Sequence, residues 1–277
     1  METENLMAIT ASAETSTGRA SESGHWYDQQ GRPIYEIRGA KGDMRPVTLR
    51  DARKFGWVPG FSGIAQLEYK PQLERWKIEQ ALLAALTLPR LPNEDDSAFL
   101  ERAREDSFRQ SREAADRGTA IHAAIQGFFE GAPVSADMIP YVEPVRAWLA
   151  QRFASEGWVA ERSFAHPKGF GGKADLSHDV LRVVVDFKCK DFDESKDLSQ
   201  LAWPEHCMQL AAYSQGFYYV DPNCVNIYVS TRVPGLIRAR EWDTQEIASA
   251  WEAFQCLLRL WQIRRNYTPA FPRVEAA

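Results

Sequence analysis

The amino-acid sequence predicts a mixed α/β protein, in which β-strands lie between amphipathic helices. The first observation is a β-branched apolar run over residues 181–185, which is typical of a buried strand. The second is the recurrence of apolar residues at helical spacing both before and after that run. With 277 residues, of which 44% are hydrophobic and 26% charged, the chain can form one large globular domain with a sizeable core.

The chain begins with two segments of different character. Residues 1–24 are rich in Ser, Thr, Glu and Ala and have no periodic apolar pattern, which predicts a disordered tail. After them, His25-Trp26-Tyr27 and Ile34-Tyr35-Glu36-Ile37 flank a Gln-Gly-Arg-Pro turn and predict a β-hairpin. We expect His25 to be structural, because a histidine beside aromatic residues at the start of a strand usually is.

A first helix is predicted from Pro71, which suits the first turn of a helix, to about Leu88. In it Leu73, Trp76, Gln80 and Leu83 recur at helical spacing. This periodicity favours packing of Trp76 in a core. The alternative is an exposed tryptophan that stacks on a nucleic-acid base.

A second long helix is predicted from Asp96 to beyond His122. We expect it to break near Gly118, where the missing side chain would permit close approach of another backbone. In its last part Gly118, His122, Ile125 and Phe129 share one face. His122 is therefore expected to point inward, towards a sheet.

The second half of the chain predicts helices and strands in alternation. Helices are expected over 142–153 and from Pro204, and strands over 159–164, 225–230 and 236–240. Residues 191–205 are acidic and predict a mobile loop. Asp243-Thr244-Gln245-Glu246 resembles a capping box for a final helix, whose apolar stripe contains Ile247, Trp251, Phe254, Leu258 and Trp261.

Charged side chains are expected to converge where the central strand ends. The apolar run continues into Asp186, Phe187 and Lys188, and side chains alternate along a strand, so Asp186 and Lys188 share one face while Phe187 points into a core. Ser177-His178-Asp179 supplies a turn that would bring Asp175 close to Asp186. Two carboxylates and an ammonium group would then meet at one strand end.

This arrangement has a specific chemical use. Paired carboxylates can hold a hard divalent cation, usually Mg²⁺, which lowers the pKa of a bound water and neutralises charge on a phosphate. An adjacent lysine can orient that water and stabilise developing negative charge. Taken alone, the pattern also fits a hairpin that ends in solvated charges.

The same residues resemble the motif of a nuclease superfamily. Asp175 followed by Asp186-Phe187-Lys188 resembles the motif that names the PD-(D/E)XK nucleases. Glu161, followed by Gly172-Lys173-Ala174-Asp175, is similar to a pattern of the RecB-like branch, in which a glutamate lies on the strand before G-x-x-D. The strands that carry Glu161, Asp175 and Asp186 thus all resemble strands of the RecB-like branch.

Two helical segments extend the resemblance. Arg117-Gly118-Thr119-Ala120-Ile121-His122 resembles the G-T-x-x-H helix of the RecB-like branch, and Gln209-Leu210-Ala211-Ala212-Tyr213 resembles its Q-L-x-x-Y helix. All four motifs occur in the family's order within the central third of the chain. They look most like those of the mitochondrial genome-maintenance exonucleases and their phage-encoded relatives.

The resemblance implies a fold and a set of roles. The fold is a restriction-endonuclease-like core, with a central mixed β-sheet flanked by helices and, here, an N-terminal hairpin and helical extension. Residues 25–277 would form one nuclease domain, with the extension over 25–95 and the catalytic core over 96–277. The implied metal ligands are His122, Asp175 and Asp186; the catalytic residues are Asp175, Asp186, Lys188 and Glu161; and the substrate-binding residues are Gln209, Tyr213, Arg117, Thr119, Lys173 and Lys190.

The implied activity is that of a metal-dependent DNA exonuclease. One or two Mg²⁺ or Mn²⁺ ions would assist hydrolysis of phosphodiester bonds, and the imidazole ligand favours Mn²⁺. The substrate would be single-stranded DNA or DNA ends in replication, repair or recombination, perhaps in a phage, with a single-strand annealing or recombination protein as a candidate partner. Alternatives are a structure-specific endonuclease or RNase that uses the same site, and a catalytically silent nucleic-acid-binding subunit.

Composition and net charge restrict the substrates, cofactors and locations that the chain is expected to have. A net charge of −5 argues against a broad footprint on duplex, whereas a single strand threaded through a channel requires less basic surface. The four cysteines contain no C-x-x-C pair, which argues against a zinc knuckle or a disulfide framework. Some RecB-like nucleases hold an iron–sulfur cluster with a clustered cysteine set, and the spacing here does not match that set, so no cluster is expected. No apolar run is long enough to span a bilayer and no secretory signal is evident, which predicts a cytosolic location. The candidate phosphate-binding cations are Arg109, Arg112, Arg117, Lys168, Lys173, Lys188 and Lys190.

Overall fold

The computed structural model describes residues 25–39, 42–69 and 71–271, so the tail predicted over residues 1–24 lies outside the described residues. The strands are β1 (Trp26–Tyr27), β2 (Pro33–Ile34), β3 (Glu36–Arg38), β4 (Met44–Pro46), β5 (Val58–Pro59), β6 (Val159–His166), β7 (Phe170–His178), β8 (Val183–Lys190), β9 (Asn223–Ser230) and β10 (Ile237–Trp242). The helices are α1 (Leu49–Phe55), α2 (Phe61–Ala65), α3 (Pro71–Thr87), α4 (Asp96–Phe129), α5 (Ile139–Arg152), α6 (Leu198–Leu201), α7 (Pro204–Gly216) and α8 (Thr244–Arg265).

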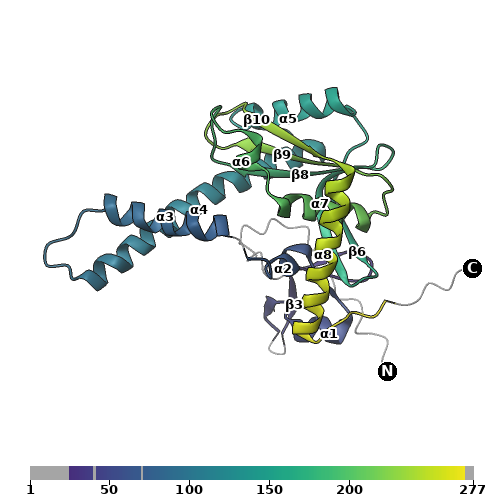
Figure 1. Cartoon of the computed structure of the whole chain (residues 1–277), viewed down its shortest axis with the longest axis horizontal. Coiled ribbons are helices and arrows are strands. Elements are labelled where there is room, and N and C mark those ends of the chain that lie inside the picture. The colour runs from purple at the N-terminus through teal and green to yellow at the C-terminus, as the bar shows by residue number, and fades with distance from the viewer. Residues whose placement is uncertain (1–24, 40–41, 70, 272–277) are drawn as a thin grey trace, which may run out of the picture.

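The centre of the molecule is a five-stranded sheet with the strand order β10-β9-β8-β7-β6. Neighbouring strands are antiparallel except β8 and β9, which are parallel and connected through α6 and α7. The sheet is therefore mixed, and helices cover both of its faces (Figure 1). This confirms the predicted fold class.

Alternation along β8 divides the interior into two cores. Val185 and Phe187 pack with Ile121 of α4 and Leu149 of α5 on one face of the sheet. Val184 belongs to the other core, which contains residues of α7 and α8. Because successive side chains of a strand point to opposite faces, this division places Asp186 and Lys188 on the side of α7.

The N-terminal elements belong to the second core. The predicted hairpin is confirmed in its first part, since Trp26 of β1 pairs with Ile34 of β2, and β5 adds a third strand. The second predicted strand is wrong beyond Ile34, because Glu36 and Ile37 belong to β3, which pairs with β4. Trp26 and Phe61 are buried in the same cluster as the residues of α7 and α8. A parallel bridge between Gly60 and Gly171 connects this small sheet to the beginning of β7.

Helices α3 and α4 form a hairpin whose far part projects from the body as an arm (Figure 1). The prediction that Trp76 packs in a core is wrong, because its side chain is 42% exposed. Two helices alone can bury only the stripe between them, and that stripe contains Ala84, Phe99 and Ala103. The predicted boundary between residues 95 and 96 falls inside this hairpin.

Two local expectations require correction. α4 runs without interruption through Gly118, so the predicted break is wrong, although the predicted close approach is present. A Cβ atom added at Gly118 would lie 3.2 Å from the Cβ of Cys189 on β8.

The prediction that residues 191–205 form a mobile loop is incomplete. This segment contains α6, which begins at the capping box of Asp197, and its residue Phe192 is buried.

The C-terminal helix confirms its sequence signature. Asp243 is the N-cap of α8, and its side chain and that of Glu246 form the predicted capping box. Phe254 and Trp261 of the predicted apolar stripe are buried against the sheet side of the helix. Among the described helices, none combines the length and apolar character needed to cross a membrane.

Candidate active site

The candidate site lies where β7 and β8 separate. The two strands pair only from Leu176–Val185 to His178–Val183. Beyond this point the amide of Phe187 donates a hydrogen bond of 2.7 Å to Oδ2 of Asp175. A carboxylate thus takes the place of a backbone acceptor, which satisfies the amide and holds Asp175 at the opening.

Three potential metal ligands meet at this opening. His122 Nε2 lies 3.5 Å from Asp175 Oδ1, and Glu161 lies opposite Asp175 in the register of β6 and β7. One ligand atom from each of these residues lies within 4.8 Å of the others. Asp186 is not part of this three-residue group, although its charge acts on His122 and Asp175.

Glu161 has an unusual backbone conformation. Its φ angle is 52°, in the left-handed region that non-glycine residues rarely adopt. Such strain costs free energy and is found where surrounding contacts hold a functional side chain in place. The carboxylate forms an ion pair with Lys173 of β7. Lys173 therefore contacts the ligand cluster directly.

Asp186 is fixed on two sides. Its Oδ2 accepts a 2.7 Å hydrogen bond from Asn226 Nδ2 on β9, and its Oδ1 accepts one of 3.0 Å from Lys188 Nζ. Asn226 in turn accepts a 2.7 Å bond at Oδ1 from Trp242 Nε1. Asn226 is fully buried, and the sequence analysis did not identify it. The available signal was a lone amide in the middle of an otherwise apolar strand.

Lys188 is held by a second network. Its Nζ also donates to Gln209 Oε1 at 2.9 Å, and Gln209 Nε2 donates to the hydroxyl of Tyr213 at 3.1 Å. The ring of Tyr213 is buried, and a Cβ atom at Gly172 would lie only 2.5 Å from it. Gln209 and Tyr213 therefore lie behind Lys188, between α7 and the sheet, and orient its ammonium group.

Burial and mutual interaction shift the pKa values of these groups. Burial raises the pKa of Asp186 to about 6, a shift to which Asp175 adds and which Lys188 opposes. Burial also acts to raise the pKa of Asp175, but the imidazole of His122 and the ammonium of Lys188 outweigh it, so this pKa is lowered. For Lys188, burial is outweighed by the carboxylates of Asp186 and Asp175, so its pKa is raised. Lys188 therefore remains a cation at neutral pH.

The same two effects, burial and neighbouring charge, act on the pKa of His122. Burial acts to lower its pKa, but the charges of Asp175 and Asp186 outweigh burial and raise it. Its ring also packs edge-on against Phe187, with 5.9 Å between ring centroids. α4 thus presents a histidine to the carboxylates, as the shared face with Ile125 predicts.

The remaining predicted substrate-binding residues lie outside this cluster. Arg117 donates to the Tyr141 hydroxyl at 3.0 Å, and Thr119 donates to the carbonyl of its own helix four residues earlier. Lys190 donates to the Leu201 carbonyl at 2.8 Å and lies over the ring of Trp203, and burial lowers its pKa to about 8. Their roles stay predictions, and the side chain of Arg112 lies outside the described part of the chain.

Comparison with known proteins gives no family assignment by sequence. No protein-family model matches the chain, and no curated protein matches it. The solved structures that match the chain include a protein designated SSO0001, with 16% sequence identity, a TM-score of 0.29, and coverage of 73% of this chain and 91% of that one.

They also include an alkaline exonuclease, LHK-Exo, from Laribacter hongkongensis, with 14% identity, a TM-score of 0.39, and coverage of 78% of this chain and 93% of that one. The same exonuclease in complex with dAMP has a TM-score of 0.37 at the same identity and coverage. An exonuclease is thus among the structural neighbours. With TM-scores below 0.5, the likeness carries no argument about activity.

Proposed function

We propose that this chain is a metal-dependent nuclease that hydrolyses phosphodiester bonds in DNA. The observation that carries the proposal is the convergence of His122, Glu161 and Asp175 beside the Asp186–Lys188 pair. Four separate elements, α4, β6, β7 and β8, supply these groups, and together they contain three of the four motifs that resemble RecB-like nucleases. In an accidental hairpin of surface charges these groups would be solvated, whereas here Asp186 is buried and the other four are half-buried.

The residues present fit a divalent cation. The ligand atoms of His122, Glu161 and Asp175 are close enough for one ion to touch all three, and Asp186 lies next to them. Carboxylate oxygens suit Mg²⁺ and Mn²⁺, and the imidazole favours Mn²⁺. Burial raises the pKa of Asp186 and the charge of Asp175 adds to the shift, so a bound cation would favour the ionised carboxylate. When bound, the cation supplies a Lewis acid that offsets charge on the phosphate and lowers the pKa of a water molecule.

Lys188 has the properties of an electrostatic stabiliser that also orients the attacking water. It stays charged at neutral pH, so it does not serve as the general base. Its ammonium group is held between Asp186 Oδ1 and Gln209 Oε1, which limits its freedom before substrate arrives. From there it would orient the attacking water and stabilise the negative charge that develops on the phosphate oxygens.

The resemblance favours exonuclease action on single strands or DNA ends, and the acidic net charge is consistent with a small footprint. The experiment that tests the proposal compares end-labelled linear single-stranded DNA with closed circular single-stranded DNA in Mg²⁺, Mn²⁺ or EDTA. The proteins are the wild type, Asp186→Ala, and Asp137→Ala as a control that removes an exposed carboxylate of the segment between α4 and α5. A matched linear RNA is a third substrate.

We expect metal-dependent degradation of the linear DNA alone, lost in Asp186→Ala and kept in Asp137→Ala. Cutting of the circle would instead assign an endonuclease, and preference for RNA would assign an RNase. DNA binding without cleavage under every condition would contradict the proposal and assign a silent binding subunit.

A further inference from the structure

The arm carries an apolar stripe on the face of α3 that points away from α4. Ile78, Leu82 and Leu86 follow at intervals of four residues and are 60%, 58% and 82% exposed. Ala84, which is buried against α4, lies roughly 160° around the helix from Leu82 at 3.6 residues per turn. The stripe is therefore on the outer side of the hairpin, where no described element of the chain covers it.

Two further large side chains border this stripe. Trp76 and Leu83 lie seven residues apart on one flank, 42% and 51% exposed. The arm therefore presents a contiguous apolar surface on a helix that has only one partner. Surfaces of this kind mark protein interaction sites.

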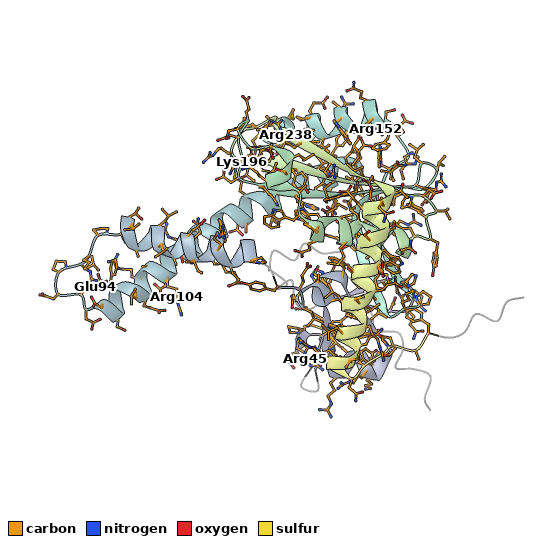
Figure 2. All side chains as sticks on the ribbon, in the orientation of Figure 1. Arg45, Glu94, Arg104, Arg152, Lys196 and Arg238 are labelled. Atoms are coloured by element: carbon orange, nitrogen blue, oxygen red, sulfur yellow. The ribbon has the colours of Figure 1, made fainter. Side chains whose placement is uncertain are left out.

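The charges of the arm do not suit a nucleic acid. Between Pro71 and Arg109 the sequence has eight acidic and six basic residues. Five of the basic side chains form ion pairs within the arm, on which Figure 2 labels Glu94 and Arg104. The pairs are Lys77–Glu74, Arg90–Asp96, Arg102–Glu94, Arg104–Glu101 and Arg109–Asp106. A surface on which five of six cations are already paired gains little from phosphates, and its near balance of charge does not oppose self-association.

The spacing of the stripe is self-complementary. If two copies of α3 pair antiparallel about Leu82, Leu82 meets its equivalent and Ile78 meets Leu86 of the other copy. This is the geometry of a two-fold interface, in which one patch contacts itself. Residues 1–24 are a poor alternative cover, because they are dominated by Ser, Thr, Glu and Ala.

The available area agrees with a weak dimer. Five side chains with on the order of 100 Å² each to bury would remove roughly 1,000 Å² from solvent over both copies, at the lower limit for a specific interface. We propose that the outer face of α3 is a homodimer interface, formed by antiparallel pairing of Ile78, Leu82 and Leu86 with the same residues of a second copy. The dimer would form at micromolar concentration and dissociate on dilution.

The test is sedimentation equilibrium of the full chain between about 1 and 100 μM, for the wild type, Leu82→Glu and Ile263→Glu. Ile263 is a matched control, equally exposed on α8. We expect a wild-type dimer, an increase of at least tenfold in the dissociation constant for Leu82→Glu, and no change for Ile263→Glu. Circular dichroism spectra identical to that of the wild type would establish that the variants are folded.

Cysteine cross-linking tests the register. In a Cys256→Ser background, which removes the exposed cysteine, Leu82→Cys should form a disulfide-linked dimer on mild oxidation. Leu100→Cys, exposed on α4, should not. A wild type that is monomeric at 100 μM, a Leu82→Glu variant that still dimerises, or cross-linking of both cysteine variants would overturn the proposal.

Discussion

The substitution Asp186→Asn tests whether the ionised carboxylate of Asp186 destabilises the fold when no metal is bound. The pKa of Asp186 is raised from 3.8 to about 6 by burial and by the charge of Asp175. The folded chain therefore favours the protonated carboxyl group more than the unfolded chain does. The stabilisation that this proton provides is complete below about pH 4 and is lost as the pH rises through about 6. At pH 7 without metal, the ionised carboxylate destabilises the fold.

The size of the effect follows from the shift. Roughly two pKa units correspond to about 3 kcal/mol of destabilisation, the upper limit of what Asn could recover. The amide oxygen of Asn can keep the bond from Asn226, but the amide nitrogen cannot accept the bond from Lys188, which reduces the gain. We expect the variant to be more stable than the wild type by about 1–3 kcal/mol, or about 2–10 °C in Tm.

The assay is thermal unfolding in EDTA from pH 4 to pH 8, repeated with Mg²⁺ or Mn²⁺. The difference between variant and wild type should grow from pH 4 to about pH 6 and then level off. Metal should raise the Tm of the wild type more than that of the variant, while the variant loses cleavage. Asp137→Asn, which removes one exposed charge, should show none of these effects. A variant that is less stable than the wild type in EDTA at pH 7 would refute the reasoning.

Three further substitutions probe the groups around Asp186. Lys188→Met should lower kcat by about 100-fold or more and keep metal affinity, and a loss confined to metal binding in calorimetry would contradict this. Asn226→Leu removes the donor to Asp186 and should weaken Mn²⁺ binding about 10–100-fold in the same calorimetric assay, so an unchanged affinity would dismiss the positioning role. Gly172→Ala places a Cβ atom 2.5 Å from the Tyr213 ring and should lower stability by about 1–3 kcal/mol in thermal unfolding, and a wild-type Tm would show that the ring has room to move.

The parts of the site that the sequence predicted are positioned by the geometry of single strands and helices. Strand alternation places Asp186 and Lys188 on one face with Phe187 on the other, as observed. The shared helical face of Ile125 and His122 likewise brings the imidazole to the sheet. These inferences need only the geometry of single elements, which the spacing of residues determines.

The missing part depends on contacts between elements. Asn226 reaches Asp186 only because β9 pairs in parallel with β8, a register that spacing along the chain does not reveal. The left-handed conformation of Glu161 is imposed by its surroundings and has no signature in residue type. Trp76 was misplaced for a related reason, because helical periodicity predicts an apolar face but not which surface covers it.

The separation of β7 from β8 explains how the fold can hold this much charge in its interior. β8 stays paired with β9 from Val183 to Lys190, so the strand that carries Asp186 and Lys188 is stable without β7. β7 is free to diverge, because the Asp175 carboxylate satisfies the amide that loses its partner. If β7 and β8 paired along their whole length, backbone groups would lie together where the carboxylates now converge. The opening therefore gives the acidic groups a place to meet, and burial there raises the pKa of Asp186, which is the condition under which a bound cation would stabilise the ionised carboxylate.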